Sequence, residues 1–255
     1  NIKTAIRVAK IELNSMFYSP VAWLVLVIFG FQIGMSFAQV YGEQVRYQDM
    51  GYDLWSVTSG VYTGMRGILP PIQRYIYLYI PLITMGLMSR EYQSGSIKLL
   101  YSSPVKNISI IMGKFLSMMV YGGMLMAVLG VFVIFSAITI VNFDYPLVLS
   151  GMLGLYLLIL AYSAIGLFMS SITKYQVVAA IGTLAVLAIL NFIGDVGQDY
   201  DLVRHITYWL SITGRAYPFI EGLIASDNIF YFLIVIGFFC KCHNGFKCLI
   251  NTVQK

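Results

Sequence analysis

The chain has 255 residues, of which 59% are hydrophobic and only 11% are charged. Soluble domains carry about 25% charged residues, so 16 Lys and Arg with 11 Asp and Glu are too few to cover a soluble globule of this size. The apolar content excludes a disordered chain, because so many apolar side chains would collapse in water. Three Cys, all between residues 240 and 248, exclude a disulfide scaffold. The composition predicts a membrane protein.

Residues 1–19 are predicted to form an amphipathic basic helix. An apolar stripe and a polar stripe recur there at helical spacing, and the polar stripe carries Lys3, Arg7 and Lys10. Such a helix is suited to lie in the headgroup plane of a bilayer. Ser19-Pro20 then ends the helix and turns the chain into the membrane. Two interpretations stay open: an anchor that only sets topology, and an elbow helix that moves with the first span.

Six apolar runs follow, and a spanning helix needs ~20 mostly apolar residues. The runs cover residues 21–41, 71–89, 115–141, 147–172, 177–193 and 229–240. In the second run, Arg74 indicates a start at an interface and Pro81 indicates a bend. The sixth run is too short to span alone unless residues 222–225 or part of the tail extend it. The predicted fold class is an all-α polytopic membrane protein, with six spans over residues 21–240 of a single domain, 1–255.

Two stretches between these runs are predicted to lie outside the membrane core. Residues 42–70 are interpreted as a solvated cap over the spans, with contact to a periplasmic partner as the alternative. Residues 194–227 are too polar to span, so we expect short helices that dip into the outer leaflet. Within that second stretch, Arg204, Arg215 and Glu221 either gate an exit or only pair at the interface.

The charges favour one orientation. If the N-terminus is inside, the inside segments hold 11 of the 16 basic residues, and their only acids are Glu12 and Glu91. This distribution satisfies the positive-inside rule, which counts Lys and Arg near span ends. Both termini are therefore predicted to be cytoplasmic.

The composition changes after Cys240. The cluster formed by Cys240, Cys242, His243 and Cys248 does not have a standard zinc spacing, so we predict no metal site. Residues 241–255 are predicted to be a cytoplasmic tail. Two interpretations of this tail stay open: a native ending, or an ending altered by a frameshift.

The loop between the second and third runs carries the most informative pattern. Glu91 is followed in order by Gly95-Ser96, Leu99-Leu100, Pro104-Val105 and Gly113-Lys114. This order resembles the membrane subunits of type-2 ABC exporters, the ABC-2 permeases. Two further segments support the resemblance: residues 166–171 with Lys174 look like the end of the family's fourth span, and residues 17–23 are similar to the gliding-motility-associated permease branch of Bacteroidetes-type bacteria.

The resemblance implies that this loop is a coupling helix that docks in a cleft of a separate ATPase. Ile97, Leu100 and Tyr101 have the spacing of one helix face, and the resemblance makes that face the docking surface. It implies that Glu91 contacts the ATPase or holds the elbow helix. Gly95 would allow close backbone approach, and Pro104 would fix the exit turn. The alternative is an ordinary polar loop whose charges only set topology.

The chain lacks a phosphate-binding loop of the form G-x-x-x-x-G-K-[ST], the motif that cradles ATP phosphates. We therefore expect a transport subunit that is not itself an enzyme and that holds no cofactor. ATP and Mg would be bound by the partner ATPase. The resemblance further implies a second permease copy or homologue, in a homodimer or heterodimer, within the bilayer of a bacterial inner membrane. No nucleic-acid partner is expected.

The leading functional hypothesis is export of an unidentified substrate along a path between two permease copies, near spans one, two and five. Gln32 and Gln39 lie within the first span, where polar groups need partners. They either face this path or hydrogen-bond to neighbouring helices. The alternative function is a membrane anchor or mechanical transmitter that drives a gliding or secretion machine and moves no solute.

Overall fold

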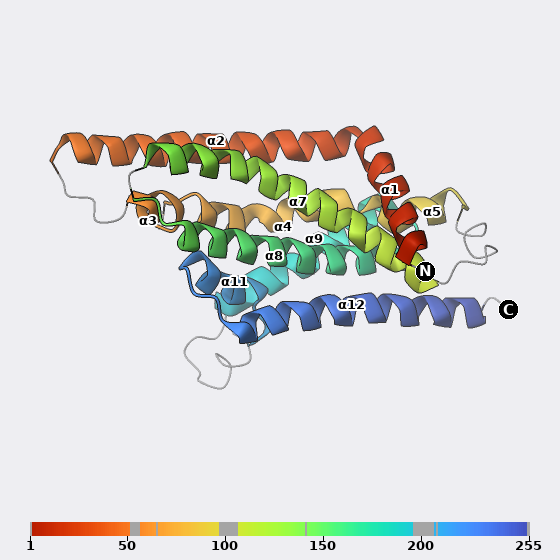
Figure 1. Cartoon of the computed structure of the whole chain (residues 1–255). Coiled ribbons are helices and arrows are strands. Elements are labelled where there is room, and N and C mark those ends of the chain that lie inside the picture. The colour runs from red at the N-terminus through yellow and green to blue at the C-terminus, as the bar shows by residue number, and fades with distance from the viewer. Residues whose placement is uncertain are drawn as a thin grey trace.

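The computed structural model describes residues 2–51, 57–64, 66–96, 107–140, 142–195, 207 and 209–253, and every regular element within them is helical. The helices form one elongated bundle (Figure 1), which confirms the all-α prediction. Both termini lie at the same end of this bundle, together with α1 and α5, and we call it the terminal end. The opposite end, which carries α3 and α11, is called the far end.

The predicted elbow helix is present as α1, Ile2–Tyr18. It ends at a sharp corner, where Ser19 caps α2 by accepting a hydrogen bond from Val21 N at 3.4 Å and Pro20 occupies the first turn of that helix. Proline suits this position because its missing N–H would have no partner there. The Trp23 indole donates to Phe17 O at 3.1 Å and braces the corner. Lys3, Arg7 and Lys10 are exposed, as the basic stripe predicts.

The first span is longer than predicted. Helix α2, Pro20–Asp49, continues for eight residues beyond the apolar run, and α3, Val57–Tyr62, follows it. The segment interpreted as a solvated cap, residues 42–70, therefore contains helical structure, and its solvation stays a prediction. The helical ladder of α2 continues past the apolar run because its backbone hydrogen bonds do not depend on a lipid contact. The Tyr62 hydroxyl donates to Ser136 Oγ at 2.8 Å and fastens α3 to α7.

The second apolar run is divided, as Pro81 predicts. Helix α4, Leu69–Thr84, stops at Met85, and α5, Gly86–Gln93, continues toward the terminal end. Pro81 has no N–H to donate to the preceding turn, which weakens the helix at this point. Ser170 of α8 stabilises the break, because its Oγ accepts from Met88 N at 3.1 Å and from Ser89 N at 3.2 Å. These N–H groups lie near the start of α5, where a helix offers few internal acceptors.

The remaining helices are given in chain order. They are α7, Asn107–Thr139, α8, Tyr145–Ile172, α9, Gln176–Phe192, a single 3₁₀ turn η1, Ile193–Asp195, α11, Ile212–Ile220, and α12, Ser226–Val253. Helix α7 begins eight residues before the predicted third span. Helix α12 shows that the tail extends the sixth run, whereas Gly222, with a φ of +87°, lies in a turn before it. The tail predicted from residue 241 is therefore helical as far as Val253, and its cytoplasmic location stays a prediction.

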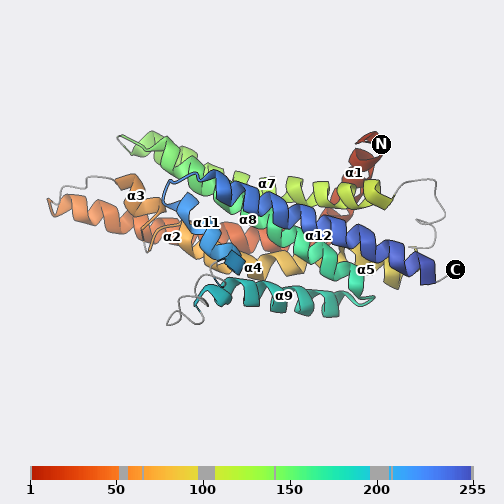
Figure 2. The same ribbon diagram turned by 90° about the horizontal axis from the view of Figure 1, so that it is seen from below.

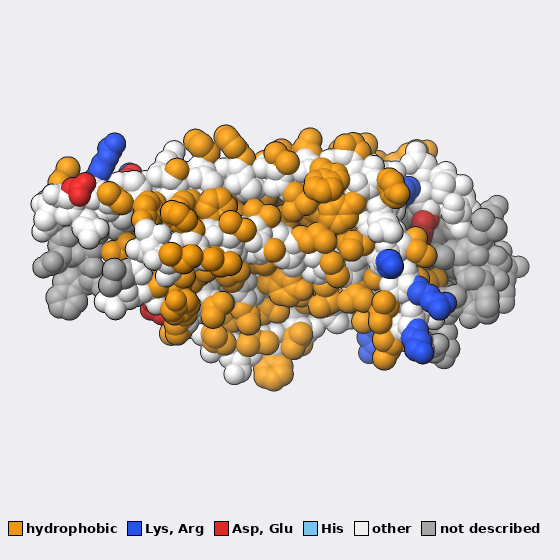
Figure 3. Space-filling view, turned by 45° about the horizontal axis from the view of Figure 1, so that its top comes forward, with side chains coloured by type: hydrophobic (Ala, Val, Ile, Leu, Met, Phe, Trp, Pro, Cys, Tyr) orange, Lys and Arg blue, Asp and Glu red, His pale blue; other side chains and the backbone are white. Residues whose placement is uncertain are grey.

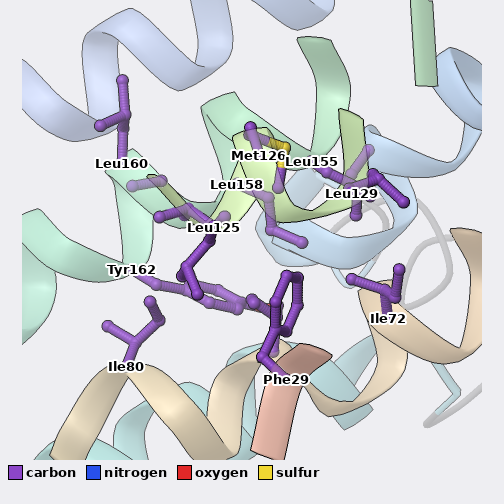
Figure 4. Close-up of a cluster of buried hydrophobic side chains, with 14 of the residues drawn as sticks. Phe29, Ile72, Ile80, Leu125, Met126, Leu129, Leu155, Leu158, Leu160 and Tyr162 are labelled. Atoms are coloured by element: carbon purple, nitrogen blue, oxygen red, sulfur yellow. The ribbon is translucent and has the colours of Figure 1, made fainter. Parts of the chain in front are cut away.

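Helix α8 lies at the centre of the bundle and packs against α4, α7, α9, α11 and α12. Figure 2 shows α12 lying along α8, with α9 and α7 at opposite sides. Phe29 of α2, Ile80 of α4, Leu125 of α7 and Leu158 of α8 are buried in one apolar cluster (Figure 4). Burial of these side chains holds four helices of the bundle together.

The outer surface has the pattern of a membrane protein. On the face in Figure 3, hydrophobic side chains cover the middle of the bundle and charged side chains lie near its two ends. An apolar surface of this extent marks an interaction with lipid or protein. Within the described residues, α2, α7 and α8 are long and apolar enough to cross a membrane. Helix α9 has 17 residues and α4 has 16, near the lower limit of about 17 for a span, so the structure gives at least three spans and leaves six as a prediction.

Candidate functional site

A cluster of three charges joins α1, α5 and α7 at the terminal end. The Lys114 side chain of α7 is 1% exposed, and its Nζ lies 2.9 Å from Glu12 Oε2 of α1 and 2.8 Å from Glu91 Oε1 of α5. The same Nζ donates a hydrogen bond to Leu87 O. One ammonium group therefore connects the elbow helix, the helix that leads into the predicted coupling loop, and the start of a spanning helix.

The three charged groups depend on one another electrostatically. An isolated charge taken out of water loses its hydration, and a partner of opposite sign offsets that loss only at short range. Lys114 meets two carboxylates, so the cluster carries one formal negative charge more than positive charge. Glu91 Oε2 is buried and accepts no hydrogen bond from a described residue. Removal of the lysine would therefore leave two neighbouring carboxylates without a cation.

Two further contacts hold the elbow helix against this site. Arg90 Nη1 of α5 donates to Ser15 Oγ of α1 at 2.9 Å. Gly113 of α7 lies directly under α1, because a Cβ atom at this position would come within 2.7 Å of Val8 Cβ and 2.8 Å of Ala5 O. A side chain at residue 113 would push the elbow helix away from Lys114.

Of the predicted coupling residues, some lie within the described part of the chain and others lie outside it. Glu91 belongs to the charge cluster, in which it holds the elbow helix through Lys114, and its contact with an ATPase stays a prediction. Gly95 follows the C-cap of α5 with a φ of +73°, a conformation that favours glycine. Ile97, Leu100, Tyr101 and Pro104 lie outside the described residues, so the docking surface stays a prediction.

Two members of the cluster, Glu12 and Lys114, were missing from the predicted site. The sequence does contain a signal for them. Glu12 and Glu91 are the only acids of the segments assigned to the inside, and Lys114 is the second residue of the Gly-Lys pair in the loop pattern. Acids are rare on that side, so those present are candidates for pairing with a buried cation.

The candidate path residues have different surroundings. Gln32 Oε1 accepts a hydrogen bond from the Tyr79 hydroxyl, which joins α2 to α4. Gln39 is exposed on α2. The structure therefore gives Gln32 the interhelical bond that was one of its two interpretations, and a contact of either residue with a substrate stays a prediction.

The candidate gate residues are not assembled as a group among the described residues. Arg215 of α11 is buried, donates to Asn228 Oδ1 at 3.1 Å and lies 3.5 Å from Asp227 Oδ2, both on α12. Its guanidinium stacks on the Trp209 ring at 4.3 Å, a geometry that attracts a cation. Glu221 is the exposed C-cap residue of α11, and Arg204 lies outside the described residues. These contacts support the pairing interpretation for Arg215, which ties α11 to α12.

The comparison with family models gives a match over residues 6–198, to the model described as ABC-2 family transporter protein. The match includes all three members of the charge cluster and ends after α9. No curated protein matches the chain. The assignment to a gliding-motility branch stays a prediction.

Proposed function

Because the chain belongs to the ABC-2 transporter family, whose members are membrane components of ABC transporters, we propose that it is the permease subunit of an exporter driven by a separate ATPase. The observation that carries this proposal is the sharing of Lys114 between Glu12 and Glu91. It links the segment expected to meet the ATPase to the elbow helix and to the start of one span. The terminal end would then face the cytoplasm of a bacterial inner membrane, with both chain ends on that side.

The contacts support a definite route for the motion. Residues 97–104 lie between the end of α5 at Gln93 and the start of α7 at Asn107, so a force on that loop would act on both helices. Lys114 and the bond from Arg90 to Ser15 connect α5 to α7 and to the elbow helix. The corner at Ser19 then connects the elbow to α2. A push on the loop would therefore displace the first and third spans together with the end of the second.

The same arrangement supports a path between two permease copies. Helices α2, α4 and α9 expose apolar side chains outward, among them Phe31, Leu78 and Ile181. In membrane proteins such a face is covered by lipid or by another chain. Tyr79 and Gln32 form a polar pair between α2 and α4. We propose that the second copy and the substrate contact the chain on this side.

Affinity purification from native membranes in mild detergent tests this function. ATP hydrolysis and the accompanying proteins are measured in the eluate. We expect the wild-type chain to bring down an ATPase with a phosphate-binding loop. We expect Leu100→Asp to reduce that association, because a charge on the docking face would be desolvated at the contact. Leu223→Asp, at an exposed leucine of the far end, is the matched control and should retain the ATPase.

Two results would contradict the proposal. One is a wild-type chain that purifies without any ATPase. The other is full association of the ATPase with Leu100→Asp, which would remove the loop from the contact.

A further inference from the structure

The far end contains a cavity of about 600 Å³ between the start of α4, the end of α9 and helix α11. Sites for small molecules typically measure about 300–1,000 Å³. Its polar lining includes Gln73, Arg74, Asn191, Ser211, Thr213 and Tyr217. None of the residues assigned above to the coupling route or to the gate lines this cavity, so it requires its own explanation.

The polar wall of the cavity is held in place before any ligand arrives. Gln73 Nε2 donates to Thr213 O at 2.7 Å, and the Thr213 hydroxyl donates to Asn191 Oδ1. The Tyr162 hydroxyl lies 3.2 Å from Thr213 Oγ1. These bonds connect α4, α8, α9 and α11 at one point, so the cavity has a preorganised wall, which lowers the entropic cost of binding.

The wall offers more hydrogen-bond donors than it uses. The described residues provide no acceptor for Asn191 Nδ2, and the Ser211 hydroxyl, which accepts a bond from Gly214 N at 3.1 Å, has its own proton left to donate. Arg74 adds a guanidinium with five N–H groups. A ligand that supplies acceptor oxygens would match this lining.

The charge of the lining favours an anion. Arg74 is the charged residue of the lining, which contains no Asp or Glu. Within the described part of the chain, no carboxylate lies within ion-pair distance of its guanidinium. Arginine binds phosphate and carboxylate through two parallel N–H···O bonds.

The cavity also borders the apolar surface of the bundle. Phe192 and Tyr75 line it and are half-exposed. Beyond them, the outward faces of α4 and α9 expose Leu78 and Leu184. A molecule with its head in the cavity would therefore lay an apolar tail along these faces, in the region of the lipid.

We propose that this cavity binds the phosphate or carboxylate head of an anionic amphiphile, with Arg74 as the charged contact. This inference rests on the proposed function, in which the far end faces outward. The amphiphile is then the class of compound that the permease releases there. The same head chemistry has another source, a free inorganic anion, and the test separates the two.

Calorimetric titration of the full chain in phosphatidylcholine nanodiscs tests this proposal, with empty nanodiscs subtracted. The probes are dioctanoyl phosphatidylglycerol, dioctanoylglycerol with the same tails and no phosphate, and inorganic phosphate. We expect saturable binding of dioctanoyl phosphatidylglycerol. Dioctanoylglycerol should bind at least about tenfold more weakly because it lacks the charged hydrogen bond, which contributes about 1.5–3 kcal/mol, and 1.4 kcal/mol is tenfold. Inorganic phosphate should bind at least about tenfold more weakly because it lacks the apolar tails that would be buried along α4 and α9.

The variants locate the binding. Arg74→Gln should weaken the binding of dioctanoyl phosphatidylglycerol about tenfold or more. Arg46→Gln, an exposed arginine of α2 that does not line the cavity, should leave it unchanged. Arg74→Lys should fall between them, because lysine keeps the charge and loses the paired geometry.

Three outcomes would overturn the proposal. Equal binding by the wild type and Arg74→Gln would show contact with the lipid surface alone. Equal binding of dioctanoylglycerol would show an apolar site, and tight binding of inorganic phosphate would show a free-anion site. None of these binding measurements requires an ATPase. Purification of the chain without an ATPase would therefore contradict the proposed function, whereas the titration alone decides whether the cavity binds an anionic amphiphile.

Discussion

At the terminal end, Lys114 is buried between two carboxylates, whereas at the far end Arg74 stands on a cavity wall with no described carboxylate in reach. Both are cations of a mostly apolar bundle, and they differ in what balances their charge. Lys114 is balanced by α1 and α5, so its charge serves to hold helices together. Arg74 has solvent and the cavity before it, so its charge is available to a ligand.

Position and partners separate two uses of a positive charge in this bundle. A buried pair contributes little net stability, yet loss of one partner is strongly unfavourable because it leaves an uncompensated charge. Helices connected in this way move as a unit. An exposed arginine contributes little to stability and can be replaced without harm to the fold. Substitutions of the two residues should therefore have opposite profiles in stability and in binding.

The largest effect is expected from Lys114→Met. This change leaves Glu12 and Glu91, both partly buried, beside each other without a cation, and breaking a buried pair costs about 3–5 kcal/mol. The apparent melting temperature in detergent should fall steeply, whereas Lys10→Met, at an exposed lysine of α1, should leave it nearly unchanged. The triple variant Lys114→Met with Glu12→Gln and Glu91→Gln should recover much of the loss, because no unpaired charge stays buried. An unchanged melting temperature for Lys114→Met would contradict the claim that Lys114 balances the charges of Glu12 and Glu91.

Arg215→Gln sharpens the comparison within the far end. Arg215 is buried against Trp209 and Asn228, and loss of its stacking and its charged hydrogen bond should cost about 2–3 kcal/mol. Arg74→Gln should change the free energy of unfolding by no more than about 0.5 kcal/mol, as for an ordinary surface position. Thermal unfolding of the two variants side by side measures this difference. Equal losses would remove the distinction between a structural and an available arginine.

Gly113→Ala tests the contact between the elbow helix and α7. The added methyl group would meet Val8 and Ala5, and overpacking of this kind typically costs about 1–3 kcal/mol. Gly123→Ala on the same helix is the matched control, because a Cβ atom there meets nothing within 4 Å, and it should be neutral or stabilising by up to about 1 kcal/mol. Melting temperatures and the reactivity of a cysteine placed at position 5 report the result. If both variants behave alike, α1 is not seated on Gly113.

The sequence anticipates the helices better than their ends. The apolar runs locate α2, α7, α8 and α9, because a bilayer requires long stretches of apolar side chains. The runs underestimate α2 and α7, since a helix continues beyond the membrane wherever its residues permit it. Pro81 predicts the break in the second run, and the break falls four residues later, at Met85, where Ser170 can cap the next helix.

The sites are harder to anticipate because they depend on packing between distant segments. Glu91 is identified from its loop pattern, whereas its partners Glu12 and Lys114 come from helices that meet only in the folded chain. The cavity around Arg74 is similar, because Gln73, Asn191 and Thr213 are far apart in the sequence. Arg74 itself reads as an interface residue at the start of a span, and only the fold places it beside unused hydrogen-bond donors.

The most direct test of the account is the effect of Glu91→Gln on ATP hydrolysis by the ATPase that purifies with this chain. We expect the ATPase to stay bound, because residues 97–104 are unaltered. Stimulation of its activity by the permease should fall about fivefold or more, the usual range of coupling energies. Glu43→Gln, at a half-exposed acid of the far end, should retain full stimulation. Full stimulation with Glu91→Gln in an intact complex would contradict transmission through the Lys114 cluster.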